Sequence, residues 1–430
     1  MTVTLNTPRL AGEVKAIASK SEVHRLLICA AMADTETLIE CSEINADIDA
    51  TARCLNALGA DIKYQDGLFT VNPISQLPCG EVTLMPGESG STLRFLLPVV
   101  CGLGINARFI MEGRLGQRPL SPLKELLEEN GATIRQEENI LYVSGKVAAN
   151  NYTIAGNISS QFISGLLFML PRIGGNITIT GKIESQPYIG MTVNALTDFG
   201  CKVIKTQDGY SVPRVSPLTS PIRTKAKGDW SNAAFFITAG VIGKQSITIT
   251  DIDIQSSQGD KAIIEVLKKF GAEIHVHDNK IIACPSKLSG TQIDASQIPD
   301  LVPILSIAAS VAKGTTHIYG AGRLRIKESD RLKACCDMLT NLGAKCHETG
   351  DGLVIEGLGI EGLGPEAQLG QTLHTDTIID SYNDHRIAMS AAIAATVCNC
   401  PVTINGAEAV NKSYPLFWED YQKLSVKEDK

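Results

Sequence analysis

The sequence has 430 residues, of which 44% are apolar and 20% are charged, proportions typical of soluble globular proteins. A chain of this length is too long to fold around a single hydrophobic core, so two domains are expected. The formal net charge of −7 argues against a nucleic-acid-binding protein, and it requires any anionic ligand to be held by locally concentrated Lys and Arg.

No targeting or membrane segment is expected. The first ten residues, MTVTLNTPRL, have neither the charged nor the apolar region of a signal peptide, and the longest apolar stretches, such as Leu301–Ala312, are too short to cross a bilayer. The 12 cysteines lack zinc-finger or C-x-x-C spacing, which indicates reduced, mostly buried thiols rather than disulfides or a metal framework. We therefore expect a cytoplasmic protein with no membrane partner and no metal.

A repeat of about 70 residues runs along the chain. Five segments share one plan: an amphipathic helix, a glycine that ends it, a strand, a tight turn and a second strand. Glycine suits the helix stop because it adopts the left-handed conformation at little cost. Hairpin turns are predicted at Asp66-Gly67, Asp208-Gly209 and Asp351-Gly352. The predicted stops are Gly59, Gly131, Gly200, Gly271 and Gly343, spaced 72, 69, 71 and 72 residues apart.

A second series of helices interleaves with the first and is apolar nearly all round, which predicts buried helices. Polar edge strands such as NITITG (176–181) are expected after them. The last interval of the series is longer because residues 357–376 are inserted. The predicted first residues are Ser21, Ser91, Ser159, Ser231, Asp300 and Asp384.

Together the two series predict an α/β protein of six βαβαββ-like units, the last of which is incomplete. Residues 1–18 are expected to supply its missing strands. The predicted domains are then residues 19–226 with three units and residues 1–18 plus 227–430 with the other three. Hinge crossings are expected near 18–20 and 225–228.

Each buried helix opens with Ser or Asp, often beside Lys, Arg, Gln or His. A helix N-terminus carries unpaired N–H groups and about half a positive charge, so it favours anions. If three such helices run parallel in each domain, their positive ends converge, and an anion-binding interdomain cleft that closes on its ligand is expected.

Several motifs concentrate cations or hydroxyls at helix starts, although each one alone also fits ordinary helix capping. A lysine before a cap costs stability unless an anion compensates its charge. The motifs in the first half of the chain contain Lys20, Ser21 and Arg25; Gly90 and Arg94; Arg118; Ser159, Ser160 and Gln161; and Ser185 and Tyr188.

In the second half, Asp300 lies between two prolines at the mouth of an apolar helix, and Lys412 lies in the loop before the last helix. Glu328 is flanked by cations, as an acid–base group could be. The dense cluster RLRIKESDR and the motif NDHR supply Arg323, Lys327, Glu328, Arg331, Asp384, His385 and Arg386.

These motifs together resemble those of the 5-enolpyruvylshikimate-3-phosphate synthase family of enolpyruvyl transferases, and the resemblance covers essentially the whole chain. Its most specific matches are SKS…R at 20–25, GxSGSTLR at 87–94, RP at 118–119, SSQF at 159–162, RxKESDR at 325–331 and NDHRIAM at 383–389. The resemblance implies two inside-out α/β domains of three units each. It also implies transfer of the enolpyruvyl group of phosphoenolpyruvate to the 5-hydroxyl of shikimate 3-phosphate, without metal or cofactor, by a monomer that binds two small anionic substrates.

The resemblance also implies residue roles. It assigns proton abstraction to Asp300 and protonation of the methylene carbon to Glu328 with Lys20, and Arg94, Tyr188, Asp384 and His385 are possible supporting residues. Arg323 receives no role. The implied shikimate-3-phosphate residues are Lys20, Ser21, Arg25, Ser159, Ser160, Gln161, Ser185, Asp300 and Lys327. The implied phosphoenolpyruvate residues are Lys20, Gly90, Arg118, Gln161, Arg331, Arg386 and Lys412.

Two alternatives stay open. A sister enolpyruvyl transferase with the same fold acts on UDP-N-acetylglucosamine and uses a cysteine in a loop that reads MEGRLGQRPL here, without one. A non-catalytic phosphate-binding protein of this fold would keep the cations at the helix starts but would not need Asp300 and Glu328.

Overall fold

The computed structural model describes residues 1–359 and 377–426, so all but the first three residues of the insertion at 357–376 lie outside the described residues. Its contacts divide the chain into two compact units. One, here called the continuous unit, is Ala18–Ala226, and the other, the split unit, is Met1–Ile17 with Lys227–Lys430. Each has its own hydrophobic core.

The continuous unit contains three four-stranded sheets, each built from one repeat. In the second repeat, for example, β7 pairs in parallel with β8, and β10 pairs antiparallel with both β8 and β9. The edge strand β15 completes the sheet of the first repeat by pairing with β4. The elements are β15 (Arg223–Lys225), α1 (Lys20–Ala31), β4 (Thr37–Glu40), α2 (Ala46–Ala57), β5 (Asp61–Gln65) and β6 (Leu68–Asn72) in the first repeat; β7 (Val82–Gly87), α3 (Gly90–Leu103), β8 (Ala107–Met111), α4 (Leu123–Glu129), β9 (Ala132–Glu137) and β10 (Ile140–Gly145) in the second; and β11 (Asn151–Ala155), α5 (Ser160–Ile173), β12 (Gly175–Thr180), α6 (Gln186–Asp198), β13 (Ile204–Lys205) and β14 (Gly209–Val212) in the third.

The described residues of the split unit repeat this plan, with two four-stranded sheets, one of three strands and one of two strands. Its elements are β3 (Gly12–Lys15), α7 (Trp230–Ile242), β16 (Ile247–Thr250), α8 (Ile263–Phe270), β17 (Glu273–His277) and β18 (Lys280–Cys284) in the fourth repeat; β19 (Gln292–Asp294), α9 (Val302–Val311), β20 (Lys313–Tyr319), α10 (Arg331–Asn341), β21 (Lys345–Glu348) and β22 (Leu353–Leu358) in the fifth; and β1 (Thr2–Leu5), β2 (Arg9–Leu10), β23 (Thr377–Asp380), α11 (His385–Ala394), β24 (Val402–Asn405), α12 (Phe417–Leu424) and β25 (Ser425–Val426) in the sixth.

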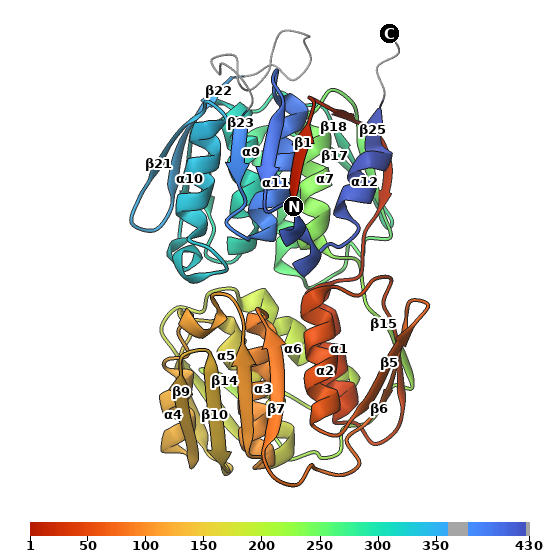
Figure 1. The fold of residues 1–430 in the computed structure, drawn as a ribbon, viewed down its shortest axis with the longest axis vertical. Coiled ribbons are helices and arrows are strands. Elements are labelled where there is room, and N and C mark those ends of the chain that lie inside the picture. Colours follow the sequence, from red (N-terminus) through yellow and green to blue (C-terminus); the bar gives the residue numbers. More distant parts are fainter. Residues whose placement is uncertain (360–376, 427–430) are drawn as a thin grey trace. The chain divides into compact units, whose positions relative to one another are not determined.

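The N-terminal strands serve two repeats rather than one. Strand β1 completes the sixth repeat, since Thr2 lies opposite Asn405 in antiparallel pairing with β24 (Figure 1). Strand β3, however, pairs in parallel with β16 and so belongs to the fourth repeat. The expectation that residues 1–18 supply strands only to the sixth repeat is therefore wrong for β3.

The apolar helices form the cores, and the sheets cover them. Every residue of α9 and α11 is buried, and α7, α9 and α11 contact one another pairwise. Strands such as β5 and β17 alternate buried and exposed residues near their starts, because one face covers the helices and the other meets solvent. Helices inside and sheets outside make the inside-out architecture that the family resemblance implied.

The five predicted helix-stop glycines all have positive φ angles, between 75° and 109°, so this prediction is confirmed. The hairpin turns are confirmed only in part. Asp66 and Gly67 form a two-residue turn with both φ angles positive, whereas Asp351 and Gly352 have no positive φ and belong to a longer connection.

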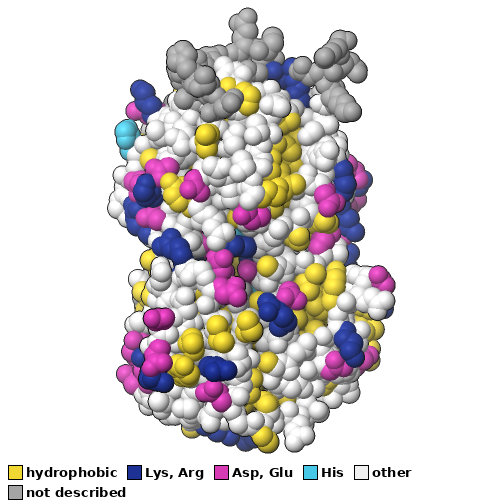
Figure 2. Space-filling model, viewed as in Figure 1, with side chains coloured by type: hydrophobic (Ala, Val, Ile, Leu, Met, Phe, Trp, Pro, Cys, Tyr) yellow, Lys and Arg dark blue, Asp and Glu magenta, His cyan; other side chains and the backbone are white. Residues whose placement is uncertain are grey.

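On the face shown in Figure 2, Lys and Arg side chains are interspersed with Asp and Glu side chains on each unit. Such mixing gives no single-signed surface of the kind that nucleic acid requires. Within the described residues, no helix combines the length and the apolar character needed to cross a bilayer.

Candidate active-site residues

Several of the predicted charged residues of the split unit gather around Arg331, whose side chain is almost completely buried. Its Nε donates to Asp384 Oδ2 at 2.7 Å, its Nη1 to Asp300 Oδ1 at 2.8 Å and its Nη2 to Glu328 Oε2 at 2.8 Å. Arg331 is the first residue of α10 because Asp330 caps that helix. One guanidinium thus joins three carboxylates that are far apart in the sequence.

Two further cations lie against Asp300. Arg386 Nη2 is 3.4 Å from Asp300 Oδ2 and its Nη1 donates to the Asp300 carbonyl oxygen at 3.0 Å, while Lys327 Nζ is 3.6 Å from Asp300 Oδ1. Asp384 caps α11 by accepting from the backbone N–H of Arg386. Asp300, Glu328 and Asp384 therefore face three cations, and we refer to these six residues as the Arg331 cluster.

These contacts set the protonation of the cluster. Burial opposes ionisation of Asp300, but Arg386, Lys327 and Arg331 outweigh it and hold the pKa of Asp300 well below its usual range. Burial likewise works against the charge on Arg331, but Asp384, Glu328 and Asp300 raise the pKa of Arg331 well above its usual value. Asp300 is thus an ionised carboxylate held by cations, and it becomes a better base only if a ligand engages those cations.

The remaining predicted residues of the split unit lie around the starts of the same helices. Lys412 Nζ donates to the carbonyl oxygen of Asn383, immediately before α11, at 2.7 Å. His385 is buried, with its Nδ1 3.9 Å from Asp384 Oδ1, a distance too long for a hydrogen bond. Arg323 donates to the carbonyl oxygen of Ser296 at 3.2 Å, so its observed contact is with backbone.

In the continuous unit, Lys20 and Arg25 connect α1 to its neighbours. Lys20 Nζ lies 2.8 Å from Asp47 Oδ2, and both side chains are 16% exposed. Arg25 is buried and donates to Thr192 Oγ1 at 2.9 Å, to the Tyr188 carbonyl oxygen at 2.8 Å and to the carbonyl oxygen of Ser21. The start of α1 is therefore tied to the starts of α2 and α6.

The starts of α3 and α5 are tied together in the same way. Arg94 Nη1 donates to Gln161 Oε1 at 2.8 Å, and Gln161 Nε2 donates to Ser91 Oγ at 2.9 Å. Arg118 lies directly over Gly90, where an added Cβ would be 2.8 Å from its Nη1. Glycine at position 90 therefore lets the Arg118 guanidinium approach the N-terminus of α3.

The predicted serines occupy helix starts, but not all in the predicted role. Ser159 caps α5 by accepting from the Gln161 N–H, and Ser160 is the buried first residue of that helix. Ser185 precedes α6 in a left-handed conformation, with φ 51° and ψ 39°. Ser21 lies within the first turn of α1, because the cap position is Ser19.

The predicted first residues differ from the observed ones by one residue in five helices and by two residues in α9; the helices begin at Lys20, Gly90, Ser160, Trp230, Val302 and His385. The caps of α1, α3 and α7 are Ser19, Ser89 and Asp229 rather than Ser21, Ser91 and Ser231. Helix α9 begins at Val302 after a 3-10 turn, η3 (Pro299–Leu301), that contains Asp300. The caps Ser19, Ser89, Ser159 and Asp229, followed by Pro299 at the start of η3, are each 70 residues apart. The predicted starts were spaced less regularly.

The structure thus brings the predicted residues together in two sets, one in each unit. The continuous unit holds Lys20, Ser21, Arg25, Gly90, Arg94, Arg118, Ser159, Ser160, Gln161, Ser185 and Tyr188. The split unit holds Asp300, Lys327, Glu328, Arg331, Asp384, His385, Arg386 and Lys412.

Sequence analysis missed the partners of these residues. Asp47 pairs with Lys20, Thr192 accepts from Arg25, and Ser329 donates to Asp384 Oδ2 at 3.0 Å. Asp47 lies in the first turn of α2, where an acidic residue is expected because it interacts favourably with the helix dipole. Its position in the sequence therefore did not indicate a cationic partner. A trio of residues with metal-binding atoms, Glu273, His275 and Cys284, lies on other elements, β17 and β18.

Comparison with known proteins shows which family the chain resembles. The family model for EPSP synthase (3-phosphoshikimate 1-carboxyvinyltransferase) matches residues 5–421. The 3-phosphoshikimate 1-carboxyvinyltransferase of Clostridium beijerinckii is 39% identical over 429 residues, covering 97% of this chain and 95% of that protein. The enzyme of the same name from Clostridioides difficile is 38% identical over 435 residues, covering 98% of this chain and 97% of that protein.

Solved structures show the same fold. The EPSP synthase of Acinetobacter baumannii matches with a TM-score of 0.78 at 25% identity, covering 99% of this chain and 98% of that chain. The resemblance that the motifs indicated is confirmed. Because the family match and both relatives span nearly the whole chain, this chain belongs to the EPSP synthase family.

Proposed function

We propose that this chain transfers the enolpyruvyl group of phosphoenolpyruvate to the 5-hydroxyl of shikimate 3-phosphate, releasing phosphate and forming 5-enolpyruvylshikimate 3-phosphate. The observation that carries the proposal is the pairing of Asp300 and Glu328 with a single buried guanidinium, Arg331. A protein that only bound phosphate would gain nothing from two carboxylates among the cations of an anion site. Family membership supports the same reaction.

The cations at the helix starts suit the two substrates, both of which carry several negative charges. In the continuous unit, Lys20, Arg25 and Arg118 stand at helix starts or over them, and backbone N–H groups there add favourable partial charge. We assign Lys20, Ser21, Arg25, Ser159, Ser160, Gln161, Ser185, Asp300 and Lys327 to shikimate 3-phosphate. We assign Lys20, Gly90, Arg118, Gln161, Arg331, Arg386 and Lys412 to phosphoenolpyruvate.

In the proposed reaction, the 5-hydroxyl oxygen attacks C2 of phosphoenolpyruvate and Asp300 accepts the hydroxyl proton. Glu328, with Lys20, donates a proton to the C3 methylene, which gives a tetrahedral ketal. Loss of a C3 proton and of phosphate from this ketal then restores the double bond. In this second step Glu328 takes the C3 proton and Asp300 gives its proton to the departing phosphate, so both carboxyl groups return to their starting states.

The Arg331 cluster suggests how the substrates activate these groups. Arg331 donates to both Asp300 and Glu328 and stabilises their negative charge. Glu328 can therefore donate a proton only after substrate binding has weakened its contact with Arg331 and it has taken up a proton. An anionic substrate that engages Arg331, Arg386 or Lys327 weakens those contacts and so raises the pKa of Asp300 from its depressed value. Proton transfer is then coupled to substrate binding.

The direct test measures phosphate release and product mass with phosphoenolpyruvate plus shikimate 3-phosphate, and separately with UDP-N-acetylglucosamine as acceptor. We expect turnover with shikimate 3-phosphate alone. Turnover with the UDP-sugar would establish the sister activity, and no turnover with either acceptor in a protein that binds both substrates would leave only a binding function.

The catalytic roles are tested by Asp300→Asn and Glu328→Gln. Loss of a positioned proton donor or acceptor should lower kcat by about 10²–10⁴. The matched control is Glu356→Gln, because Glu356 is an exposed carboxylate on β22, and it should retain full activity. A Glu328→Gln variant that binds both substrates and keeps most of its kcat would exclude Glu328 as the acid.

We further propose that the protein works as a monomer in the cytoplasm and without a cofactor. All 12 cysteines are unpaired and eight are buried, as expected of a protein from a reducing compartment. Sedimentation of the purified chain at working concentration checks the oligomeric state, and fractionation of its host cells checks the location.

A further inference from the structure

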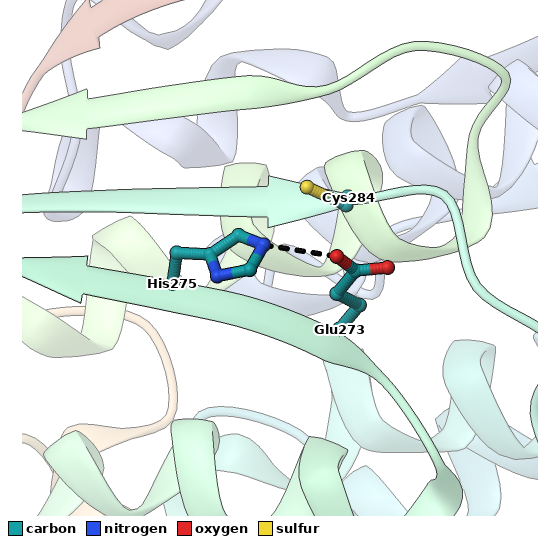
Figure 3. A group of neighbouring side chains, drawn as sticks. All are labelled: Glu273, His275 and Cys284. Atoms are coloured by element: carbon teal, nitrogen blue, oxygen red, sulfur yellow. Dashed lines mark hydrogen bonds and ion pairs between the residues drawn. The ribbon is translucent and has the colours of Figure 1, made fainter.

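Three side chains with metal-binding atoms converge on the β17–β18 hairpin of the fourth repeat. Antiparallel pairing places Glu273 directly opposite Cys284, and His275 follows Glu273 two residues along the same strand. All three side chains point from the same face of the sheet (Figure 3). Their ligand atoms all lie within 4.8 Å of one another, and His275 Nε2 is 2.9 Å from Glu273 Oε1.

The geometry points to a divalent metal site, and we propose that Glu273, His275 and Cys284 bind zinc with one carboxylate oxygen, one imidazole nitrogen and one thiolate, water completing the tetrahedron. Zinc lies about 2.0–2.3 Å from such ligands, so neighbouring ligand atoms in a tetrahedron are about 3.3–3.7 Å apart. The observed separations are at most 4.8 Å, and the one between His275 Nε2 and Glu273 Oε1 is 2.9 Å, so they lie within roughly 1.1 Å of that range.

The side chains can make this adjustment while the backbone stays in place. The side chains of His275 and Glu273 are 49% and 64% exposed, so they can change rotamer without disturbing the core. The strand register already sets the three Cα positions, because Glu273 pairs with Cys284 and His275 with Ile282. Side-chain ordering, loss of the His275–Glu273 hydrogen bond and loss of the Cys284 thiol proton then oppose binding, but no backbone rearrangement does.

The donor set selects the class of metal. Thiolate and imidazole ligands favour zinc and similar transition metals over calcium or magnesium, which prefer oxygen ligands only. A carboxylate, a thiolate and a neutral imidazole together carry two negative charges, which balance a divalent cation. The trio shares no residue with the Arg331 cluster, so the proposal is independent of the catalytic assignment.

The hairpin also offers matched controls. His277 lies two residues beyond His275 on the same strand, and their rings stack with centroids 6.4 Å apart, but His277 is not part of the trio. Cys79 is an exposed thiol in the continuous unit. Replacing Cys79 removes a thiol that lies outside the proposed site, and replacing His277 removes an imidazole that stacks on His275 but is not one of the three proposed ligands.

The test titrates the full chain, freed of metal and kept reduced, with Co²⁺ as a spectroscopic substitute and then with Zn²⁺. We expect one Co²⁺ per chain, with thiolate-to-cobalt absorption in the near ultraviolet and the visible bands of a tetrahedral ion, both abolished by one equivalent of Zn²⁺. Cys284→Ser should remove the thiolate band. His275→Gln should weaken zinc binding by more than about tenfold, since even indirect partners of a ligand contribute that much.

Cys79→Ser and His277→Gln should bind cobalt and zinc like the unchanged chain, and circular dichroism of each variant confirms that it is folded. The proposal is overturned if no thiolate band appears. It is overturned equally if the folded Cys284→Ser chain keeps that band or if Cys79→Ser loses it, since either result assigns the metal to another thiol.

Discussion

At the scale of single residues, the most connected side chain in the candidate site is Arg331. Its three carboxylate partners come from the segment before α9, the segment before α10 and the cap of α11. Removal of one partner from a buried ion pair leaves an uncompensated charge, and this cost exceeds the net contribution of the intact pair. The cluster is therefore sensitive to single substitutions.

Asp384→Asn tests this sensitivity. Asparagine is also a good helix cap, so α11 should keep its start while Arg331 loses the carboxylate that holds its Nε. We expect the free energy of unfolding to fall by about 3 kcal/mol, and kcat to fall with it. Urea unfolding followed by circular dichroism measures the change.

Asp278→Asn is the matched control, because Asp278 lies in an exposed turn of the same unit with φ 47°, a conformation that Asn also accepts. Its effect should stay within about 0.5 kcal/mol. Equal decreases in the free energy of unfolding of Asp384→Asn and Asp278→Asn would mean that the pairing of Asp384 with Arg331 does not stabilise the fold.

The depressed pKa of Asp300 predicts a pH dependence of stability. Burial raises this pKa, but Arg386, Lys327 and Arg331 lower it further than burial and Glu328 raise it, so the folded chain binds this proton more weakly than the unfolded chain. The stabilisation is then complete above the unfolded value of about 3.9 and is lost as the pH falls toward the folded pKa.

We expect the difference in unfolding free energy between the unchanged chain and Asp300→Asn to shrink as the pH is lowered from about 5 to about 3. Urea unfolding at a series of pH values measures it. A difference that stays constant over this range would show that the Asp300 carboxylate has no stabilising contact with those cations.

Gly90→Ala tests the approach of Arg118 to α3. The added Cβ would lie 2.8 Å from Nη1 and 3.0 Å from Cζ of Arg118, so the guanidinium must move. Since we assign Arg118 to phosphoenolpyruvate, we expect the KM for phosphoenolpyruvate to rise several-fold while the fold is retained. Steady-state kinetics with each substrate varied in turn measure the effect.

Gly190→Ala is the control within helix α6, because a Cβ there meets nothing within 4 Å. It should leave both KM values unchanged and stabilise the chain by up to about 1 kcal/mol, since alanine is the better helix former. A normal KM in Gly90→Ala would remove Arg118 from the phosphoenolpyruvate site.

At the scale of the elements, the repeated helix stop is the clearest link between sequence and structure. Gly59 and Gly271 occupy equivalent positions with φ 106° and 101°, which cost a residue with a Cβ about 1–2 kcal/mol. A Cβ at Gly59 would also lie 2.6 Å from the carbonyl oxygen of Gln76, whereas at Gly271 the nearest atom is 3.1 Å away.

We therefore predict that Gly59→Ala destabilises the chain more than Gly271→Ala does. Thermal unfolding of both variants measures the two shifts in Tm against the unchanged chain. Equal shifts would show that the φ angle alone sets the cost and that the backbone near Gln76 yields freely.

Not every element could be predicted, and the failures have physical causes. The shared plan predicted a tight turn in all five segments, but it did not place the turns Glu138-Asn139 and Asp278-Asn279, because neither contains glycine, although Glu138 and Asp278 have positive φ angles. The strand in NITITG was expected at an edge, yet β12 lies between β11 and β14. Its polar residues only mark the outer face of the sheet.

In the candidate site, too, some features could be predicted from the sequence and others could not. The cations at the helix starts could be predicted, because a cation at the positive end of a helix dipole is unfavourable without an anion, and neighbouring residues in the sequence suffice to recognise it. The pairing of Arg331 with Asp384 could not, because 53 residues separate them and only the fold brings them together. The contact of Lys20 with Asp47 was missed for the same reason.

At the scale of the whole molecule, the split unit depends on its first strand. Strand β1 lies opposite all four residues of β24, whose Val402 and Ile404 are completely buried. Deleting residues 1–5 should therefore destabilise the split unit and leave the continuous unit intact. Hydrogen exchange should show faster exchange in α11 and β24 with unchanged protection in α3 and α5.

The fragment 18–226 is the complementary test, because it holds all three sheets and the whole core of the continuous unit. We expect it to unfold cooperatively on its own. A fragment without cooperative unfolding would show that the continuous unit needs the rest of the chain.

The division of the chain has a consequence for its synthesis. The ribosome completes residues 18–226 without interruption, so that unit can fold while translation continues. Strand β1 is made before the continuous unit, yet its partner β24 is made after that unit and ends at Asn405. Strand β1 must therefore wait unpaired while about 400 residues are translated, and during that time a chaperone would find an exposed strand edge to protect.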